Sequence, residues 1–455
     1  MKVNGKIIGP DKKGSSIKIQ LEETQYNKVG QLSVNLKPFF DFDSDFKGSV
    51  AFDFFTIAIM VYGIDNLLQR YTYSIDGWTR EIDFTFPVSN KEQWDQVKEE
   101  FEKVLCFLTG DEWKIDFEQN TYDGEYYWDN DKRRKRPSFS QNNTTFDAVS
   151  LFSGGLDSLI GIVDYFEEHP DRKLLLVSHY DSNSGGPNAD QQRVTKKLDL
   201  QYSNNYEWIQ TGISLHLNGI KREPSYRSRS LMFVALGVYF ASLYPEGITL
   251  RIPENGSISL NYPLTPSRRS SLSTRTTHPY LINSLQKILH AIGVQVILTN
   301  PYDEHTKGQM LVNSKNLAFI NNAFRDAVSC GKRGRKAHWD PPTEGVYHCG
   351  TCMPCIYRRA ALNAVGLDIE RYGIDLFQPG KGIEYIQNLP DIAALIDYMR
   401  TPLSKEQIEA NLLVNGSLPF EKLSLYADVV LNTKEEIKAW VRNKADGETK
   451  RIFGL

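Results

Sequence analysis

The chain has 455 residues, enough for two or three domains, and its 53 Lys and Arg residues nearly balance its 56 Asp and Glu residues. This balance excludes a strongly basic protein that coats nucleic acid and a purely acidic tail. The first residues lack the order of a secretion signal, and five cysteines do not make a disulfide scaffold in a chain of this size. The most apolar stretch, SLMFVALGVYFASLY, is only about fifteen residues long, so we expect a cytoplasmic protein without a membrane span.

Residues 1–120 mix both kinds of secondary structure and predict a small α+β domain. Alternating apolar residues predict strands over 14–23, 80–88 and 112–120. Helical spacing of apolar residues predicts helices over 53–71 and 91–110. Residues 121–145 are polar and are interrupted by Pro137, so we expect a linker there.

From Phe146 onward, predicted strands and helices alternate along the chain. Strands are predicted over 148–152, 173–182, 206–213 and 247–256. Helices follow the first three of these strands, which predicts an α/β fold with a parallel sheet and crossover helices. We assign residues 146–384 to this domain and residues 385–455 to a helical C-terminal extension.

The segment LFSGGLDSLIGI joins the first of these strands to its helix through adjacent glycines. Such a turn presents backbone N–H groups to an anion at the positive end of a helix. Asp157 would repel phosphate, so its presence suggests a bound Mg²⁺ or an orienting role. The loop lacks the Walker A lysine and the spaced glycines of a dinucleotide fingerprint. We expect it to bind phosphate through Ser153, Gly154, Gly155, Leu156, Asp157 and Ser158.

Four cysteines lie close together in the sequence: Cys330, Cys349, Cys352 and Cys355. Three of them follow the spacing Cys-x₂-Cys-x₂-Cys, and the upstream one completes a tetrahedral set, which favours structural Zn²⁺. His348 is an alternative to Cys330 as the fourth ligand. An iron–sulfur cluster or thiol chemistry is a second interpretation, and Cys106 is expected to be an ordinary core residue.

The motif SGGLDS resembles the pyrophosphate-binding loop (PP-loop) of the N-type ATP pyrophosphatases, which have an adenine nucleotide alpha hydrolase-like fold. A PP-loop followed by Cys…Cys-x₂-Cys-x₂-Cys is similar to the 7-cyano-7-deazaguanine synthases (QueC-like proteins), over roughly 146–382. The resemblance implies ATP and Mg²⁺ as cofactors, a structural Zn²⁺, and adenylation of 7-carboxy-7-deazaguanine followed by attack of ammonia. It also implies that His179 and Tyr180, at the end of the second strand, frame the adenine.

The chain departs from that family at several positions. The family's Pro-Gly-Arg-Asn segment corresponds here to SYRSRSLMF, in which Arg229 matches the arginine and Ser230 replaces the asparagine. The family's Asp-Cys-Arg segment is replaced by the polar stretch 251–281. In that stretch Glu254 and Asn255 suit a guanine-like face, because a carboxylate matches an N1–H/N2–H pair. Candidate groups for a carboxylate or phosphate are Arg268, Arg275 and His278.

The extra length resembles the QueC-like proteins of bacterial antiphage systems of the Qat type. That resemblance implies a protein amine as a possible acceptor in place of ammonia, because an acyl-adenylate reacts with any well-placed neutral amine. The domain at 1–120 is then expected to dock this protein partner. Asp157, Ser158 and Arg229 are the expected catalytic residues.

Two alternatives remain open from the sequence. PP-loop enzymes also thiolate tRNA, and the basic runs 132–136 and 332–336 suit an RNA backbone. A non-catalytic subunit that senses nucleotide is the other alternative, which the loss of the asparagine equivalent at Ser230 would allow.

Overall fold

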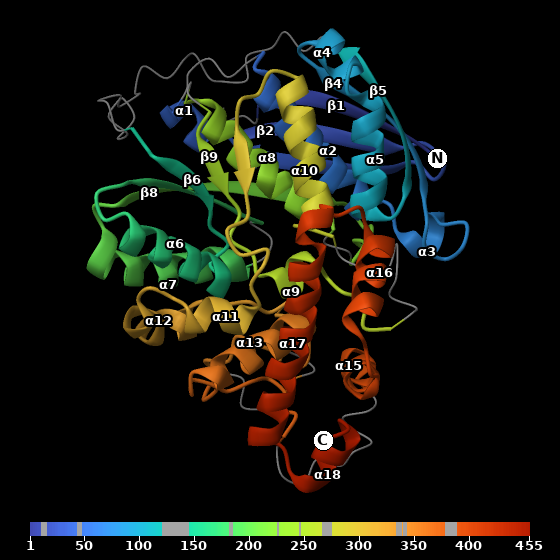
Figure 1. Cartoon of the computed structure of the whole chain (residues 1–455). Coiled ribbons are helices and arrows are strands. Elements are labelled where there is room, and N and C mark those ends of the chain that lie inside the picture. Colours follow the sequence, from blue (N-terminus) through green and yellow to red (C-terminus); the bar gives the residue numbers. More distant parts are fainter. Residues whose placement is uncertain are drawn as a thin grey trace.

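The computed structural model describes residues 1–10, 16–42, 48–120, 145–181, 185–224, 227–244, 247–265, 275–333, 339, 344–377 and 389–455. Within these residues ten strands form one mixed sheet in the order β10-β9-β6-β7-β8-β3-β2-β1-β4-β5 (Figure 1). The strands are β1 (Lys2–Pro10), β2 (Ser16–Glu23), β3 (Lys28–Asn35), β4 (Glu81–Val88), β5 (Glu112–Gln119), β6 (Ala148–Leu151), β7 (Leu174–Tyr180), β8 (Tyr206–Leu217), β9 (Thr249–Arg251) and β10 (Ile297–Thr299).

The half of the sheet that follows Phe146 is entirely parallel, from β10 to β8. Parallel neighbours require crossover connections, and helices lie in each of these connections. They are α6 (Leu156–Glu168), α7 (Gly185–Tyr202), α8 (Arg229–Ser242), α9 (Gly256–Ser259) and α10 (Pro279–Ala291). The predicted α/β character of this region and its alternating order are therefore confirmed.

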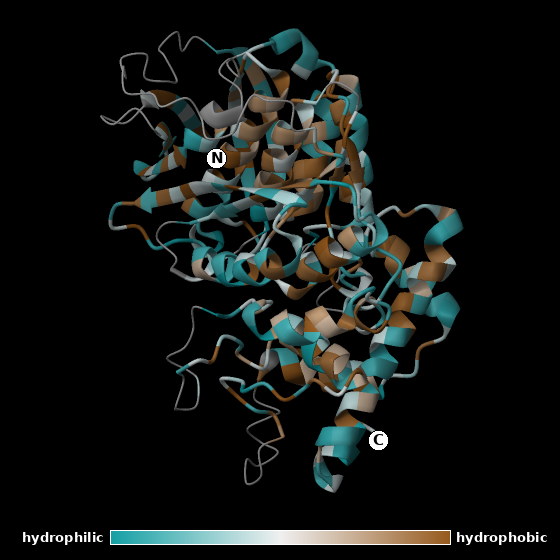
Figure 2. Ribbon diagram, turned by 90° about the vertical axis from the view of Figure 1, so that its left-hand side faces the viewer, coloured by the Kyte–Doolittle hydropathy of each residue, from teal (hydrophilic) through white to brown (hydrophobic). Residues whose placement is uncertain are grey.

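Successive side chains of the central strands point to opposite faces of the sheet, because the side-chain period of a strand is two. Val149 and Val177 belong to the core that contains α8 and α10. Leu174 and Leu176 belong to the core on the other face, which contains α6 and α7. Figure 2 shows hydrophobic residues concentrated in the interior, between the sheet and its helices. The buried strands are apolar on both faces for this reason.

The N-terminal strands extend the same sheet through the pairing of β3 with β8, in which Val34 lies opposite Ile213. One hydrophobic core runs from Val3 through α2 and α8 to Leu298. The helices of this part are α1 (Lys37–Phe42), α2 (Val50–Leu67), α3 (Arg70–Tyr73), α4 (Lys91–Asp95) and α5 (Lys98–Thr109). The predicted boundary near residue 120 stays a prediction, and nearly all of the predicted linker lies outside the described residues.

Helix α2 is the one helix in the described part of the chain that is long and apolar enough to cross a membrane. The helix predicted over 53–71 is confirmed, but the sequence analysis took residues 230–244, and not this helix, as the most apolar stretch of the chain. In the structure 94% of its 18-residue window is buried against the sheet and α8. Its composition thus matches that of a helix surrounded by protein.

The described C-terminal region is helical, as predicted, and packs beside α9 and α13 (red in Figure 1). Its core includes Leu260 and Tyr357 of the preceding region together with Trp440. The remaining elements are α11 (Lys307–Val312), α12 (Leu317–Ala323), η3 (Phe324–Asp326), α13 (Met353–Ala364), α15 (Pro390–Arg400), α16 (Lys405–Asn415), η5 (Phe420–Lys422), α17 (Leu423–Lys444) and α18 (Gly447–Ile452).

Candidate functional site

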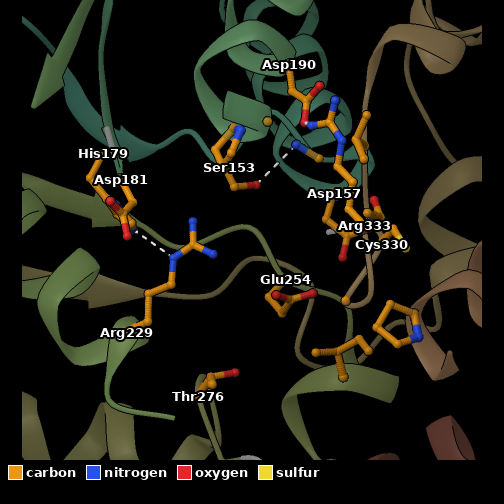
Figure 3. Close-up of a pocket in the computed structure, with 18 of the residues that line it drawn as sticks. Ser153, Asp157, His179, Asp181, Asp190, Arg229, Glu254, Thr276, Cys330 and Arg333 are labelled. Carbon is orange, nitrogen blue, oxygen red and sulfur yellow. Dashed lines mark hydrogen bonds and ion pairs between the residues drawn. The ribbon is translucent and has the colours of Figure 1, made fainter. Parts of the chain in front are cut away.

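A cavity of about 960 Å³ lies beyond the carboxyl ends of the parallel strands (Figure 3). This is the edge of an open α/β sheet at which ligands usually bind. Six of the predicted site residues line it, and they come from four different segments of the chain. They are Ser153, Gly155, Asp157, His179, Arg229 and Glu254, with Cys330 of the cysteine cluster as a seventh.

The glycine loop connects β6 to α6 in the predicted strand–turn–helix arrangement. Gly154 has φ +77°, a left-handed conformation that glycine adopts without steric cost. Ser153 Oγ accepts a hydrogen bond from the Gly155 N–H at 3.2 Å and lies 3.2 Å from Ser158 Oγ. Ser158 also donates to the Gly155 carbonyl. The hydroxyls therefore fold the loop over the N-terminus of α6.

The segment just before Cys330 holds the same loop from the other side. The Val328 N–H donates to the Gly154 carbonyl at 2.9 Å, and Ser329 Oγ accepts from the Leu156 N–H at 3.1 Å. Both Val328 and Ser329 line the cavity. The cysteine-bearing segment is thus in direct contact with the loop, across more than 170 residues of sequence.

Asp157 is buried at the base of the cavity between three polar side chains. The Lys307 ammonium forms an ion pair with it, and Asn255 Nδ2 donates to Asp157 Oδ2 at 2.7 Å. Burial alone would raise the pKa of Asp157. The Lys307 charge and the hydrogen bonds from Glu254, Lys307 and Asn255 outweigh burial and lower that pKa.

Glu254 lies next to Asp157 and behaves in the opposite way. Burial and the charge of Asp157 hold the pKa of Glu254 well above its usual range. Two adjacent buried carboxyl groups disfavour a double negative charge, so the proton of the pair resides on Glu254. An ionised carboxylate such as Asp157 is a ligand type that Mg²⁺ commonly uses together with substrate phosphates.

His179 and Arg229 face one another across the cavity from the loop. Arg229 Nε lies 3.3 Å from His179 Nε2, and the His179 ring packs edge-on against Phe233. Burial and the charge of Arg229 hold the pKa of His179 well below its usual range, so the ring is neutral and accepts this hydrogen bond.

Arg229 differs from the other cations of the cavity. Lys307, Arg222 and Arg333 each form an ion pair with a carboxylate: Asp157, Asp181 and Asp190, respectively. Among the described residues Arg229 has no carboxylate partner, and it projects into the cavity in Figure 3. An uncompensated guanidinium in a partly buried site suits a phosphate or carboxylate group.

Tyr180 and Asn255, two further predicted site residues, are not among the residues that line the cavity. A Cβ atom at Gly212 would lie 3.1 Å from the Tyr180 hydroxyl, so the Tyr180 ring lies over β8. Asn255 caps α9 by accepting from the Ile258 N–H and reaches the site through Asp157. Ser230, the expected asparagine replacement, donates to the Arg227 carbonyl.

Arg275 and His278 do not reach the cavity. Arg275 donates to the Phe107 carbonyl at 3.1 Å and lies over the Phe107 ring, which belongs to α5. His278 is buried and caps α10 by accepting from the Tyr280 N–H. Neither is among the described residues that line the cavity, and Arg268 lies outside the described residues. Their polarity serves the contact between α5 and α10.

The four clustered cysteines come together, as predicted, with their sulfur atoms within 4.8 Å of one another. Four sulfurs around a tetrahedral Zn²⁺ would be about 3.8 Å apart, and Cys349 Sγ lies 3.8 Å from Cys355 Sγ. The backbone N–H groups of Cys349 and Lys332 donate to Cys330 Sγ, as expected for a thiolate. This group could therefore bind zinc.

His348 is not part of this group. Its Nε2 accepts a hydrogen bond from the Ser329 N–H at 3.3 Å, so it supports the segment that contacts the glycine loop. Cys106 lies on α5, where the Trp113 N–H donates to its sulfur. The structure thus places Cys330 rather than His348 with the other three cysteines.

The two described residues of the basic run 332–336 are both paired with carboxylates. Lys332 is paired with Asp391 and Arg333 with Asp190. The run at 132–136 and the residues 334–336 lie outside the described part of the chain.

Several residues that line the cavity belong to no motif recognised in the sequence, above all Lys307, Asp190 and Tyr62. A signal for Lys307 does exist in the sequence. Lys307 lies eight residues after the end of β10, and Thr306 and Gln309 form a capping box that begins α11. The carboxyl ends of parallel strands lie at one edge of the sheet. The first residues of α11, which follows β10, are therefore expected near the first residues of α6, which follows β6.

Comparisons with protein-family models, with curated proteins and with solved structures found no match for this chain.

Proposed function

We propose that the cavity binds ATP, with its β- and γ-phosphates on the loop of residues 153–158, and that the protein is an AMP-forming, carbon–nitrogen bond-forming ligase. The observation that carries this proposal is the glycine loop, which opens at a helix N-terminus into a cavity that also contains Arg229. Backbone N–H groups, hydroxyls and a guanidinium that pairs with no carboxylate among the described residues together suit a polyphosphate.

The proposed reaction has two steps. An oxygen of the substrate carboxylate forms a bond to the α-phosphorus of ATP, and the bond from that phosphorus to the bridging oxygen breaks, so that pyrophosphate leaves. A neutral amine then attacks the acyl carbon, AMP leaves with the electrons of the acyl–oxygen bond, and the amine loses a proton. The products are an amide, AMP and pyrophosphate. With ammonia as the amine, the amide oxygen can attack the α-phosphorus of a second ATP with loss of pyrophosphate; the amide nitrogen then loses its two protons and AMP leaves with that oxygen, which gives the nitrile.

The residues of the chain supply binding and charge in this scheme. Ser153 and Ser158 direct hydroxyls toward the departing pyrophosphate, and Arg229 stabilises the charge that develops on the bridging oxygen. Lys307 adds a second positive charge at the base of the cavity. Asp157, the ionised member of the carboxyl pair, would hold Mg²⁺, which would neutralise phosphate oxygens.

The substrate class rests on the resemblance to the 7-cyano-7-deazaguanine synthases. We propose a 7-deazaguanine carboxylate, with Glu254 facing the N–H groups of the base and His179 in the part of the cavity that receives the nucleotide. The amine is ammonia or an amine of a partner protein. The second acceptor corresponds to the resemblance to the QueC-like proteins of bacterial antiphage systems. The cysteine cluster would hold a structural Zn²⁺ beside the loop.

The test is mass spectrometry of the purified protein with Mg-ATP and 7-carboxy-7-deazaguanine, in the presence of ammonia or of the product of a neighbouring gene. Asp157→Ala is the test variant, and Asp171→Ala, at an exposed position after α6, is the matched control. We expect AMP with an amide, a nitrile or a mass-shifted partner from the wild type and the control, and none from Asp157→Ala.

The same experiment separates the alternatives. If AMP forms with neither acceptor, the deazaguanine assignment is wrong. A persulfide on Cys330 together with co-purified tRNA would then indicate tRNA thiolation, because Cys330 is the clustered cysteine that lines the cavity. ATP binding without turnover would indicate a nucleotide-sensing subunit.

A further inference from the structure

Helix α17 of the C-terminal region lies against both segments that supply the partners of Asp157. Val429, Thr433 and Glu436 fall on one face of this helix, at helical spacing. Thr433 and Val429 contact the segment that begins α9, and Glu436 contacts the segment that begins α11. Asn255 belongs to the first segment and Lys307 to the second.

Glu436 is directed at the start of α11. One carboxylate oxygen accepts a hydrogen bond from the Thr306 hydroxyl, and the other accepts from the Gly308 N–H at 3.2 Å. A Cβ atom at Gly308 would lie 2.4 Å from the Glu436 carboxylate, so only glycine permits this approach. The two contacted residues, Thr306 and Gly308, flank Lys307 on either side.

The contact with α9 is similar in kind. Thr433 Oγ1 lies 2.6 Å from Ser257 Oγ, and a Cβ atom at Gly256 would meet Val429 at 3.0 Å. Asn255, which donates to Asp157, is the residue that caps α9. Helix α17 therefore contacts the starts of both α9 and α11, the two segments whose side chains Asn255 and Lys307 bind Asp157 of α6.

We propose that Glu436 is a positioning residue for Lys307: it fixes the backbone on both sides of Lys307 so that the ammonium group meets Asp157 at the base of the cavity. Its consequence for catalysis rests on the proposed function, whereas its effect on the position of Lys307 does not. All the hydrogen bonds of Glu436 described in the structure go to the start of α11. Removal of the Glu436 carboxylate should therefore loosen the backbone at the start of α11.

The first test measures the environment of Lys307 without any nucleotide. Purified full-length Glu436→Ala is labelled with an amine-acetylating reagent, and the labelling rate of Lys307 is followed by peptide mass spectrometry, with hydrogen exchange over 306–312 in parallel. The matched control is Glu435→Ala, because Glu435 is exposed on the same helix and pairs only with Lys438 in the described structure. Thermal unfolding of each variant checks its folding.

We expect Glu436→Ala to raise the labelling rate of Lys307 roughly tenfold, because two hydrogen bonds to a charged group are lost. Glu436→Gln keeps one acceptor oxygen and should give an intermediate rate, which also guards against a variant that does not fold. Glu435→Ala should match the wild type. A Lys307 labelling rate in Glu436→Ala and Glu436→Gln equal to that of Glu435→Ala would overturn the proposal.

The second test is a double-mutant cycle with ATP affinity as its readout. If Glu436 acts through Lys307, Glu436→Ala should weaken ATP binding roughly tenfold in the wild type and less than about twofold in Lys307→Ala. Equal losses in both backgrounds would overturn the positioning role. If the wild type binds no ATP, the proposed function fails by itself, and the labelling result still decides the role of Glu436.

Discussion

The conformation of one backbone residue decides whether the glycine loop can open toward the cavity. Gly154 has φ +77°, and a Cβ atom placed there would lie 3.1 Å from both the backbone nitrogen and Cγ of Gln191. Any other residue type would therefore meet backbone strain and a close contact at the same time. Since Gln191 also donates to the His179 carbonyl, the two sides of the cavity are joined at this point.

We predict that Gly154→Ala weakens ATP binding by at least about tenfold, with a loss of roughly 1–2 kcal/mol in the free energy of unfolding. Gly77→Ala is the control, because Gly77 also has a positive φ but has nothing within 4 Å of an added Cβ. Calorimetric titration and urea unfolding measure the two effects. Equal ATP affinity in both variants would contradict the role given to the loop.

His278 gives a prediction about pH at the contact between α5 and α10. Burial and the charge of Arg275 lower the pKa of His278 to about 3. The folded state thus favours neutral His278, so its contribution to stability is complete above about pH 6.5, the usual histidine pKa, and is lost as the pH falls from there toward 3.

We therefore expect His278→Asn, which can still cap α10, to lose less thermal stability than the wild type between pH 7.5 and pH 5. His290→Asn, at an exposed position at the end of the same helix, is the control and should follow the wild type. Thermal unfolding at both pH values is the measurement. An unchanged pH dependence in His278→Asn would contradict this explanation.

The glycine loop and the cysteine cluster could be located from the sequence because each has a local pattern. The glycine turn and the Cys-x₂-Cys-x₂-Cys spacing each lie within a few consecutive residues, so their meaning does not depend on distant packing. Lys307 and Glu436 lie 150 and 279 positions after Asp157, and neither belongs to a recognised motif. The prediction that Arg275 and His278 bind a substrate group placed them at the cavity, which they do not line. Polarity alone cannot distinguish a ligand site from a buried contact between helices.

At the scale of elements, the cysteine cluster acts as a support for the glycine loop. Cys330 follows directly after Val328 and Ser329, which both hydrogen-bond to that loop. His348, beside Cys349, accepts from the Ser329 N–H. A metal ion that fixes the cluster would therefore also fix the loop, since a structural zinc site contributes directly to folding.

We predict that the protein contains one zinc ion per chain and that Cys349→Ser loses both the zinc and most of the ATP affinity. Cys106→Ser is the matched control, because Cys106 is the cysteine outside the cluster. Metal analysis and calorimetric titration on the same preparations give the two readouts. Full ATP affinity in zinc-free protein would show that the cluster does not support the loop.

At the scale of the whole molecule, a buried network of charges joins the N-terminal helices to the start of α8. Arg80 is fully buried and pairs with Asp65 and Asp111 at 2.6 Å. Asp65 also accepts from the Ser228 hydroxyl, and Ser228 directly precedes Arg229. The N-terminal part of the chain therefore contributes to the position of the Arg229 guanidinium in the cavity.

We expect Arg80→Met to cost about 3–5 kcal/mol of unfolding free energy, because it leaves Arg70 as the one guanidinium that pairs with the two buried carboxylates of Asp65 and Asp111 in the described structure. Lys91→Met, which breaks an exposed ion pair with Asp95 at the other end of the same region, should cost at most about 1 kcal/mol. Urea unfolding compares them. If Arg80→Met lowers the free energy of unfolding as little as Lys91→Met does, the buried charge network does not stabilise the fold as proposed.

The continuity of the sheet could not be predicted from the sequence, whereas its parallel half could. Alternating strands and helices after Phe146 specify a parallel sheet locally, because each crossover follows its own strand. The pairing of β3 with β8 joins residues about 180 positions apart, for example Val34 with Ile213, and no local pattern encodes that choice. Helix α2 likewise acquires its burial from distant segments.

The central claim is that the loop of residues 153–158 holds the β- and γ-phosphates of ATP. The most direct measurement compares the affinities of the wild type for ATP and for AMP by calorimetric titration, and repeats both titrations with Ser153→Ala. The account predicts that ATP binds at least about tenfold more tightly than AMP, and that this preference shrinks in Ser153→Ala. Equal affinity for ATP and AMP in the wild type would contradict it.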